Sequence, residues 1–154
     1  MLKTAEKGRL GSTGISNVPG AVELTHRRLA TWHNITLEAN AAANGTEYHI
    51  ARFPRACKLV AAHETEHANV AADASNFLTL TISKRTAGGA ATSVATLTGN
   101  VAQTLLVPTA LTLNSNAAVL ELAAGDSLTI KTTKTGTGRA LPAYAQVTVD
   151  VEEI

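Results

Sequence analysis

Hydrophobic and polar positions alternate with a period of two in short runs along most of the chain. In the clearest run, Leu78, Leu80 and Ile82 fall on one face, while threonine and serine fall on the other. Successive side chains of an extended chain point to opposite sides, so this alternation is typical of a strand that is buried on one face. The run therefore predicts a half-buried strand over residues 76–83.

Further runs predict strands in the same way. Residues 127–133 place Leu128 and Ile130 inward, and residues 144–152 place small and branched side chains on one face. The inward residues of the second run are Ala145, Val147, Val149 and Val151. Weaker candidate strands are residues 34–39, 47–53, 93–97, 103–107 and 118–122.

Turn signals separate these runs. They are Asn44-Gly45, Gly88-Gly89, Gly99-Asn100, Gly125-Asp126 and Gly136-Thr137-Gly138. About eight short strands, with a turn signal every ten residues or so and no alternation with long helices, predict an antiparallel sandwich or barrel. The expected fold is all-β, an antiparallel β-sandwich of jelly-roll type.

The first 29 residues follow no such period. Turn-forming residues punctuate this polar stretch, namely Gly8, Gly11, Gly14, Pro19 and Gly20. We therefore expect an extended N-terminal arm over residues 1–29 and one sandwich domain over residues 30–154. Two interpretations of the arm stay open: a frayed terminus, or a segment that is ordered against a neighbouring subunit.

Composition and charge narrow the function classes. The 13 Lys and Arg against 12 Asp and Glu leave a net charge of +1, and like charges occur in nothing longer than doublets. This balance predicts neither a nucleic-acid partner nor a membrane partner. Only 3% of residues are aromatic, which removes the usual stacking platforms for sugars and exposed bases. The charged start lacks the apolar run of a signal peptide, so we expect a soluble protein that is not conventionally secreted.

One motif could carry chemistry, because residues 63–67 match the pattern His-Glu-x-x-His. In zinc peptidases the two histidines share a helix face and meet one metal, and the glutamate acts as general base. On a strand, His63 and His67 would lie about 13 Å apart, too far for one zinc ion. Glu64 would then point to the opposite side, so secondary structure decides whether this motif is a zinc site.

The local sequence leaves helix and strand open. The alanine-rich residues 61–74 permit a helix, whereas Pro54 and the strand-rich context favour an extended chain. The motif also departs from the zincin family at Thr65 and Glu66, where that family has an apolar and an uncharged residue. Val70 stands where the family's extended motif needs a glycine.

We therefore expect a solvated strand or turn that carries His63, Glu64, Glu66 and His67. Weak metal binding across subunits and a zinc metallopeptidase are the alternatives. We assign no catalytic residue, cofactor or metal ligand, and we expect that the protein is not an enzyme.

Two weaker features remain. Cys57 is expected to be a small buried thiol, with a nucleophile paired to a histidine as the alternative. Lys131, Lys134 and Arg139 are candidates for a basic rim at one end of the sheet, although a solvated face is the preferred interpretation.

Three stretches, residues 48–60, 72–82 and 122–130, carry a family resemblance, together with residues 138–142. Their motifs are an apolar-Arg-x-Pro-Arg-Ala turn into a strand, an Asp-x-x-Asn approach to a threonine-rich strand, and an Ala-Gly-Asp turn into another strand. Together they resemble small virion proteins of tailed bacteriophages, especially head decoration (cement) proteins, over roughly residues 33–152.

This resemblance implies a jelly-roll sandwich that binds the outside of a phage capsid and stabilises the shell. The implied partner is the major capsid protein, the implied assembly is a homotrimer, and the implied location is the outer surface of the virion. The segment from His63 to Val70 corresponds to a strand and the loop that leaves it. A fibre or host-attachment binding module is the alternative function, and a zinc metallopeptidase using His63, Glu64 and His67 comes after it.

Overall fold

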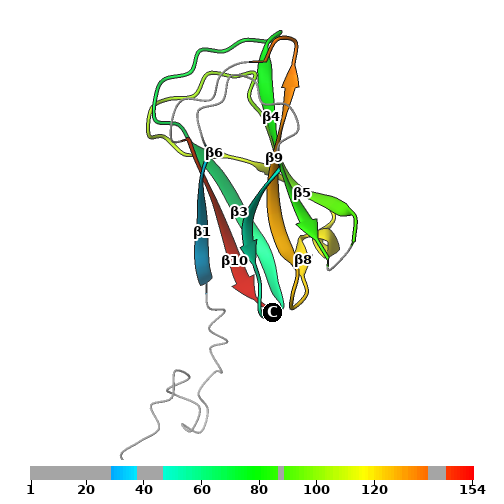
Figure 1. Cartoon of the computed structure of the whole chain (residues 1–154). Helices are drawn as coiled ribbons and strands as arrows, with labels where there is room; N and C mark the ends of the chain where they lie inside the picture. Colours follow the sequence, from blue (N-terminus) through cyan, green and yellow to red (C-terminus); the bar gives the residue numbers. More distant parts are fainter. Residues whose placement is uncertain (1–28, 38–46, 87–88, 139–144) are drawn as a thin grey trace, which may run out of the picture.

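The structure is a computed structural model that describes residues 29–37, 47–86, 89–138 and 145–154. Over these residues the chain forms antiparallel strands in two packed sheets (Figure 1). The long strands are β1 (Leu29–Leu37), β2 (Glu47–Arg52), β3 (Cys57–Thr65), β4 (Phe77–Arg85), β5 (Ala91–Thr98), β9 (Ser127–Thr135) and β10 (Ala145–Glu153). The short elements are β6 (Thr109–Ala110), β7 (Thr112–Leu113), the 3-10 helix η1 (Ala117–Leu120) and β8 (Glu121–Leu122). The expected all-β sandwich is confirmed.

The order of the strands is that of a jelly roll. The first sheet has the order β1-β10-β3-β6, with β8 also paired to β3, and the second has the order β2-β9-β4-β5-β7. Strands β1, β3 and β10 thus alternate with β2, β4 and β9 between the sheets, as two Greek keys require. In place of a continuous fourth strand, β6 and β8 pair with opposite ends of β3.

The predicted inward faces form the core between the sheets. Leu78, Leu80 and Ile82 of β4 are buried, as are Leu128 and Ile130 of β9. The four inward residues predicted for β10 are buried as well. Each such leucine or isoleucine contributes about 1.5–3 kcal/mol when it leaves water, so the alternating pattern supplies much of the driving force for folding.

Strand β3 lacks a clean alternation because it contains a β-bulge. Leu59 pairs with Val151 and Ala61 pairs with Asp150, so Val60 has no partner of its own on β10. One extra residue shifts the phase of the pattern, and inward positions change from odd to even numbers after it. This shift explains why the period-two pattern did not identify β3.

Two weaker strand predictions were wrong. In residues 103–107 only Gln103 forms a bridge, to Val70, and the residues after it form a turn and loop. The apolar side chains there are consecutive rather than alternating, so hydrophobicity alone gave the wrong element. In residues 118–122 most of the segment is η1, which starts where the Asn116 side chain accepts a hydrogen bond from the backbone N–H of Ala118 at 3.1 Å.

The Asp-x-x-Asn motif forms a polar junction before β4. Asp73 Oδ1 accepts hydrogen bonds from the backbone N–H groups of Ser75 at 2.8 Å and Asn76 at 2.9 Å. Asn76 Oδ1 in turn accepts from the backbone N–H and the hydroxyl of Thr137. The neighbouring Gly136 has a φ of 61° and lies so close to Ser75 that a Cβ would sit 2.3 Å from its carbonyl oxygen. Glycine is therefore required at this position.

The expected arm over residues 1–29 lies outside the described residues, apart from Leu29, which begins β1.

Candidate functional site

The His-Glu-x-x-His motif lies at the end of β3 and not on a helix. His63 and Glu64 belong to the strand, and His67 follows it. Glu64 faces the core, while His63 is partly exposed on the other side and His67 is exposed. The expected extended conformation is confirmed, and it separates the residues that a helical zinc site would bring together. Across the part of the chain that the structure describes, no group of three His, Cys, Asp or Glu residues could hold a metal ion.

The two glutamates differ from the prediction, which placed them in solvent. Glu64 is 2% exposed and Glu66 is 1% exposed. Both follow Ala62 at two-residue intervals: the pleat of β3 carries Ala62 and Glu64 inward, and Glu66, directly after the strand, continues the alternation. The side-chain amide of Gln103, which is also buried, donates a hydrogen bond to Glu64 Oε2. A buried carboxylate is stable only when such partners replace its lost hydration.

The loop above these glutamates is attached to the end of β3 by backbone hydrogen bonds. We call residues Val101–Val107 the apical loop, because it lies at the upper end of the sandwich in Figure 1. Gln103 and Val70 exchange two backbone bonds of 2.9 Å, and the N–H of Leu106 donates to the Glu66 carbonyl at 2.8 Å. The N–H of Leu105 donates to Asn69 Oδ1 at 2.8 Å. The loop is therefore held in one conformation over the carboxylates.

The apical loop presents apolar side chains to solvent. We define the apical patch as Val101, Leu105, Leu106 and Val107, which are 52%, 44%, 59% and 51% exposed. Leu106 also has a φ of 58°, in the left-handed region. That conformation costs a leucine about 1–2 kcal/mol, and such strain persists only where the surroundings enforce it. The loop thus holds a leucine outward at a cost in backbone energy.

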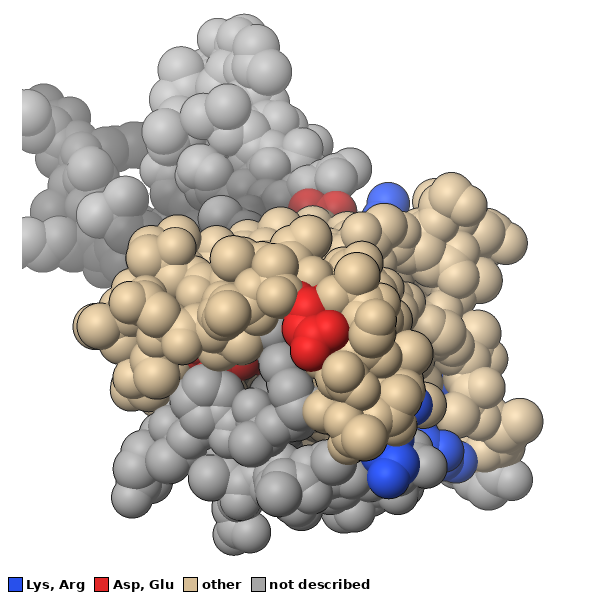
Figure 2. All heavy atoms as spheres, turned by 90° about the horizontal axis from the view of Figure 1, so that it is seen from above, with Lys and Arg blue, Asp and Glu red and all other residues tan. Residues whose placement is uncertain are grey.

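The stretch of chain that carries the apical patch is uncharged. Residues 86–120 contain no Asp, Glu, Lys, Arg or His. Figure 2 views this end from above, and its described surface is mostly uncharged, with an acidic group near the centre and basic groups toward the margin. This uncharged stretch can be read directly from the sequence, but the alternation of hydrophobic and polar positions does not point to it.

The outer face of the second sheet is a second candidate surface. We call it the hydroxyl face, because most of its residues are threonine and serine, with Lys131 opposite Thr81 on the same face. The hydroxyl residues are Thr79, Thr81, Ser83, Thr96, Thr98 and Thr133. The register places Thr79 opposite both Thr98 and Thr133, and Thr81 opposite Thr96. Such cross-strand threonine pairs stabilise a sheet and leave hydroxyl groups available at its surface.

A charged network closes the edge of the hydroxyl face. Arg85 Nε donates to Glu47 Oε1 at 2.7 Å, the Arg85 Nη2 group lies against Glu47 Oε2, and the Thr129 hydroxyl donates to Oε1 as well. The hydrogen bonds from Arg85, followed by that from Thr129, lower the pKa of Glu47 to about 2. This carboxylate therefore stays ionised well below neutral pH and joins β2, β9 and β4.

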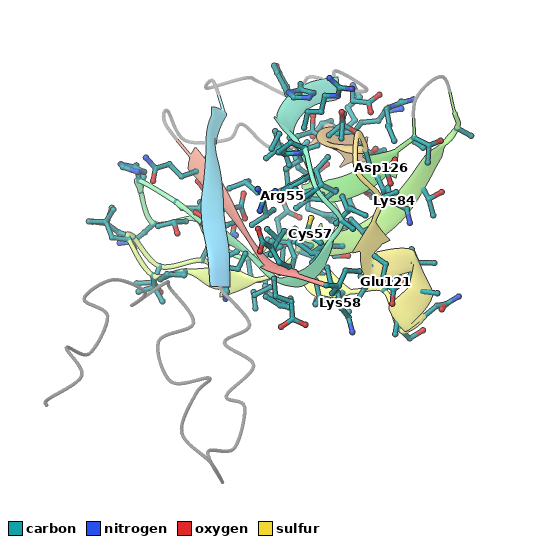
Figure 3. All side chains as sticks on the ribbon, turned by 90° about the horizontal axis from the view of Figure 1, so that it is seen from below. Arg55, Cys57, Lys58, Lys84, Glu121 and Asp126 are labelled. Atoms are coloured by element: carbon teal, nitrogen blue, oxygen red, sulfur yellow. The ribbon has the colours of Figure 1, made fainter. Side chains whose placement is uncertain are left out.

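The lower end of the sandwich carries paired charges instead. Figure 3 views it from below and labels the residues of this end. Arg55 forms an ion pair with Glu153 at 3.6 Å, and Lys84 Nζ donates to the Glu121 carbonyl at 2.7 Å. Asp126 Oδ2 accepts from the backbone N–H of Ala123 at 2.9 Å within the Ala-Gly-Asp turn. These contacts hold the turns at the lower end of the sandwich in place.

Cys57 is buried at this lower end, as predicted. Burial, with smaller effects from Asp126 and Glu153, raises the pKa of its thiol. A raised pKa disfavours the thiolate that a nucleophile needs, so the residue packs as a small apolar side chain. Of the candidate basic rim, Lys131 and Lys134 are exposed on β9, and Arg139 lies outside the described residues.

Comparisons with known proteins identify no relative. No family model matches the chain, and no curated protein or solved structure matches it significantly. In the described part of the chain, no helix is long and apolar enough to cross a bilayer. The functional interpretation therefore depends on the residues and their geometry.

Proposed function

We propose that this protein is a structural virion protein that binds the outside of a tailed-phage capsid and stabilises the shell. The observation that carries the proposal is the jelly-roll order of the strands in the region that resembles head decoration proteins. Jelly rolls occur in viral capsid proteins, lectins and cupins, and the resemblance favours the first of these.

The residues that carry the resemblance lie at the junctions of this sandwich. Phe53, in the Arg-x-Pro-Arg turn, donates its N–H to the Asp126 carbonyl at 2.9 Å and accepts from the N–H of Gly125 at 2.7 Å. Two of the three similar stretches are thus hydrogen-bonded to each other at the lower end. The third, from Asp73 to Asn76, fixes the entry to β4. The stretches that carry the resemblance therefore join elements of the sandwich to one another.

The physics of shell binding suits a rigid sandwich without catalytic machinery. A cement protein gains its affinity from modest contacts that are repeated over a lattice, and multivalency then makes them strong. In this proposal the partner is the major capsid protein, the protein assembles as a homotrimer, and its location is the outer surface of the virion.

Co-sedimentation of the full chain with capsid shells tests the proposal. The shells come from the phage whose genome carries the gene, in expanded and unexpanded forms. We expect saturable binding to expanded shells and a higher temperature of shell disruption when the protein is bound. An unrelated β-sandwich of similar size is the control. Equal recovery of the two proteins with the shells would reject the proposal.

The hydroxyl face favours a second candidate, a fibre or host-attachment binding module. Its threonine hydroxyls can donate to and accept from the hydroxyl groups of glycans, although aromatic stacking residues are scarce. A glycan array with the full chain tests this candidate. A reproducible hit that is lost in Thr81→Val and Thr96→Val would support it, and an array without hits would reject it.

A further inference from the structure

We propose that a pocket beside Arg52, at the lower end of the sandwich, binds the carboxylate of an acidic side chain on a partner protein. We call it the Arg52 pocket and define it by its lining residues, Arg52, Pro54, Ala124 and Gly125. A guanidinium group with apolar walls beside it suits a short apolar chain that ends in a carboxylate. The inference stands apart from shell binding, because a peptide that carries one carboxylate tests it.

The guanidinium group of Arg52 is positioned before any ligand binds. Its Nε–H donates to the Gly125 carbonyl at 3.3 Å, and a Cβ added to Gly125 would lie 3.7 Å from Nη2. This bond uses one of the five N–H donors of the group, so the donors on the two Nη atoms remain for a ligand. A carboxylate can accept two parallel hydrogen bonds from such a pair of nitrogens.

Backbone hydrogen bonds join the two turns that form the pocket. Phe53, between Arg52 and Pro54, donates its N–H to the Asp126 carbonyl at 2.9 Å and accepts from the N–H of Gly125 at 2.7 Å. The second turn is closed by the bond from the N–H of Ala123 to Asp126 Oδ2 at 2.9 Å. Because the walls and the guanidinium group are already held together, binding costs little conformational entropy.

Arg52 differs from the other described arginines because it has no carboxylate partner. Arg55 forms an ion pair with Glu153 at 3.6 Å, and two nitrogens of Arg85 bond to Glu47. Among the described residues, no Asp or Glu pairs with Arg52, which is exposed. A fixed guanidinium group without a counter-charge is complementary to an anion.

The pocket favours an acidic side chain over other anions. It is open to solvent, whereas sites for small free ligands enclose most of the ligand surface. Phosphate groups carry up to about two charges and commonly bind helix N-termini or several cations, but Arg52 is the one charged residue of the lining. One carboxylate matches one guanidinium group, and the methylene groups of Asp or Glu can pack against Pro54 and Ala124.

A peptide titration of the full chain near pH 6, at constant ionic strength, tests the inference. The probe is the capped tripeptide Ala-Glu-Ala, and the capped tripeptide Ala-Gln-Ala is its neutral control. NMR of the arginine Nε–H groups and of the Gly125 backbone N–H follows binding. We expect a saturable shift of the Arg52 and Gly125 signals with a Kd of about 10 mM, and no saturable shift with the neutral peptide.

Substitutions separate the charge from the shape of the pocket. Arg52→Gln should abolish binding, and Arg52→Lys should weaken it about fivefold or more, because an ammonium group lacks the planar fork. Ala124→Leu keeps the guanidinium group but fills the pocket, so it should weaken binding about tenfold. Unchanged circular dichroism of each variant verifies that the fold is kept.

Arg55→Gln is the matched control. It removes a guanidinium group at the same end of the sandwich, where Figure 3 labels Arg55, but this side chain is 79% exposed and already paired with Glu153. Its substitution should leave the affinity for the acidic peptide unchanged.

Four outcomes would overturn the inference. They are an Arg52 signal that does not saturate by about 200 mM peptide, an equal response of Arg55 in the wild-type chain, unchanged affinity in Arg52→Gln or Ala124→Leu, and tighter binding of inorganic phosphate than of the acidic peptide. The last outcome would assign the pocket to phosphate groups.

Discussion

The two ends of the sandwich differ in how they hold their charged and apolar side chains. At the lower end, Arg55 and Lys84 lie outside and Cys57 lies inside, while the buried Asp126 accepts a hydrogen bond from the backbone N–H of Ala123 within its turn. At the upper end, Glu64 and Glu66 lie inside and the leucines of the apical loop lie outside. The comparison teaches that the lower end buries one carboxylate, which a turn N–H satisfies, whereas the upper end buries two glutamates beneath a loop with several exposed apolar side chains.

Substitution of Gln103 should have the largest effect on stability. Gln103→Ala removes the amide that donates to the buried Glu64 carboxylate and also leaves a small cavity. We expect the free energy of unfolding to fall by about 2–4 kcal/mol, because a buried carboxyl group loses a hydrogen-bond partner and the shortened side chain leaves a cavity. Urea denaturation at neutral pH measures it. The neighbouring, exposed Thr104→Ala is the control and should change stability by less than about 0.5 kcal/mol. An equal effect of the two substitutions would contradict a contribution of the Gln103–Glu64 hydrogen bond to stability.

Substitution of one glycine at each end compares the two ends directly. Gly136→Ala at the upper end meets the Ser75 carbonyl oxygen and also has a positive φ, so it should cost about 2–4 kcal/mol. Gly125→Ala at the lower end has a φ of 95° but meets nothing closer than Arg52 at 3.7 Å, so it should cost only about 1 kcal/mol. Thermal unfolding followed by circular dichroism measures both variants. A larger loss in Gly125→Ala would reverse the expected order.

The Glu47 network on the second sheet should make stability depend on acid. The folded-state pKa of Glu47 is lowered from 4.5 to about 2, so its contribution is complete above pH 4.5 and is lost as the pH falls toward 2. Because the pair is partly exposed, we expect no more than about 1 kcal/mol. Glu47→Gln should lower stability at pH 7 and converge on wild type near pH 2. If the difference in stability between Glu47→Gln and wild type stayed constant from pH 7 to pH 2, ionisation of Glu47 would not contribute to stability.

The smallest expected effect is a gain in stability in Leu106→Asn. Asparagine adopts a left-handed φ more easily than leucine does, so the variant should be more stable than wild type by about 0.5 kcal/mol. Urea denaturation at low protein concentration measures the change. A loss of more than about 1 kcal/mol would mean that Leu106 packs within its own chain and that the patch is structural.

Much of the fold followed from the period-two pattern, because β4, β9 and β10 bury one face and expose the other. The pattern did not identify β3, because the bulge at Val60 moves the inward positions from odd to even residue numbers. Residues 103–107 were predicted to form a strand from their apolar side chains, but the left-handed φ of Leu106 is incompatible with a strand there.

The candidate site was less predictable. Carboxylates are almost always solvated, so Glu64 and Glu66 were placed outside. Only their two-residue spacing from Ala62, after the bulge, marks them as inward. The strand conformation of the His-Glu-x-x-His segment, in contrast, followed from its strand-rich context.

The position of β10 has a consequence for synthesis of the protein. β10 lies between β1 and β3, so the middle of the first sheet comes from residues 145–153 and its neighbours come from much earlier in the chain. A nascent chain cannot pair β1 with β3 in its place, because neither is the other's neighbour. The first sheet therefore closes only after these residues have left the ribosome, and until then the buried face of β3 depends on the second sheet or on chaperones for cover.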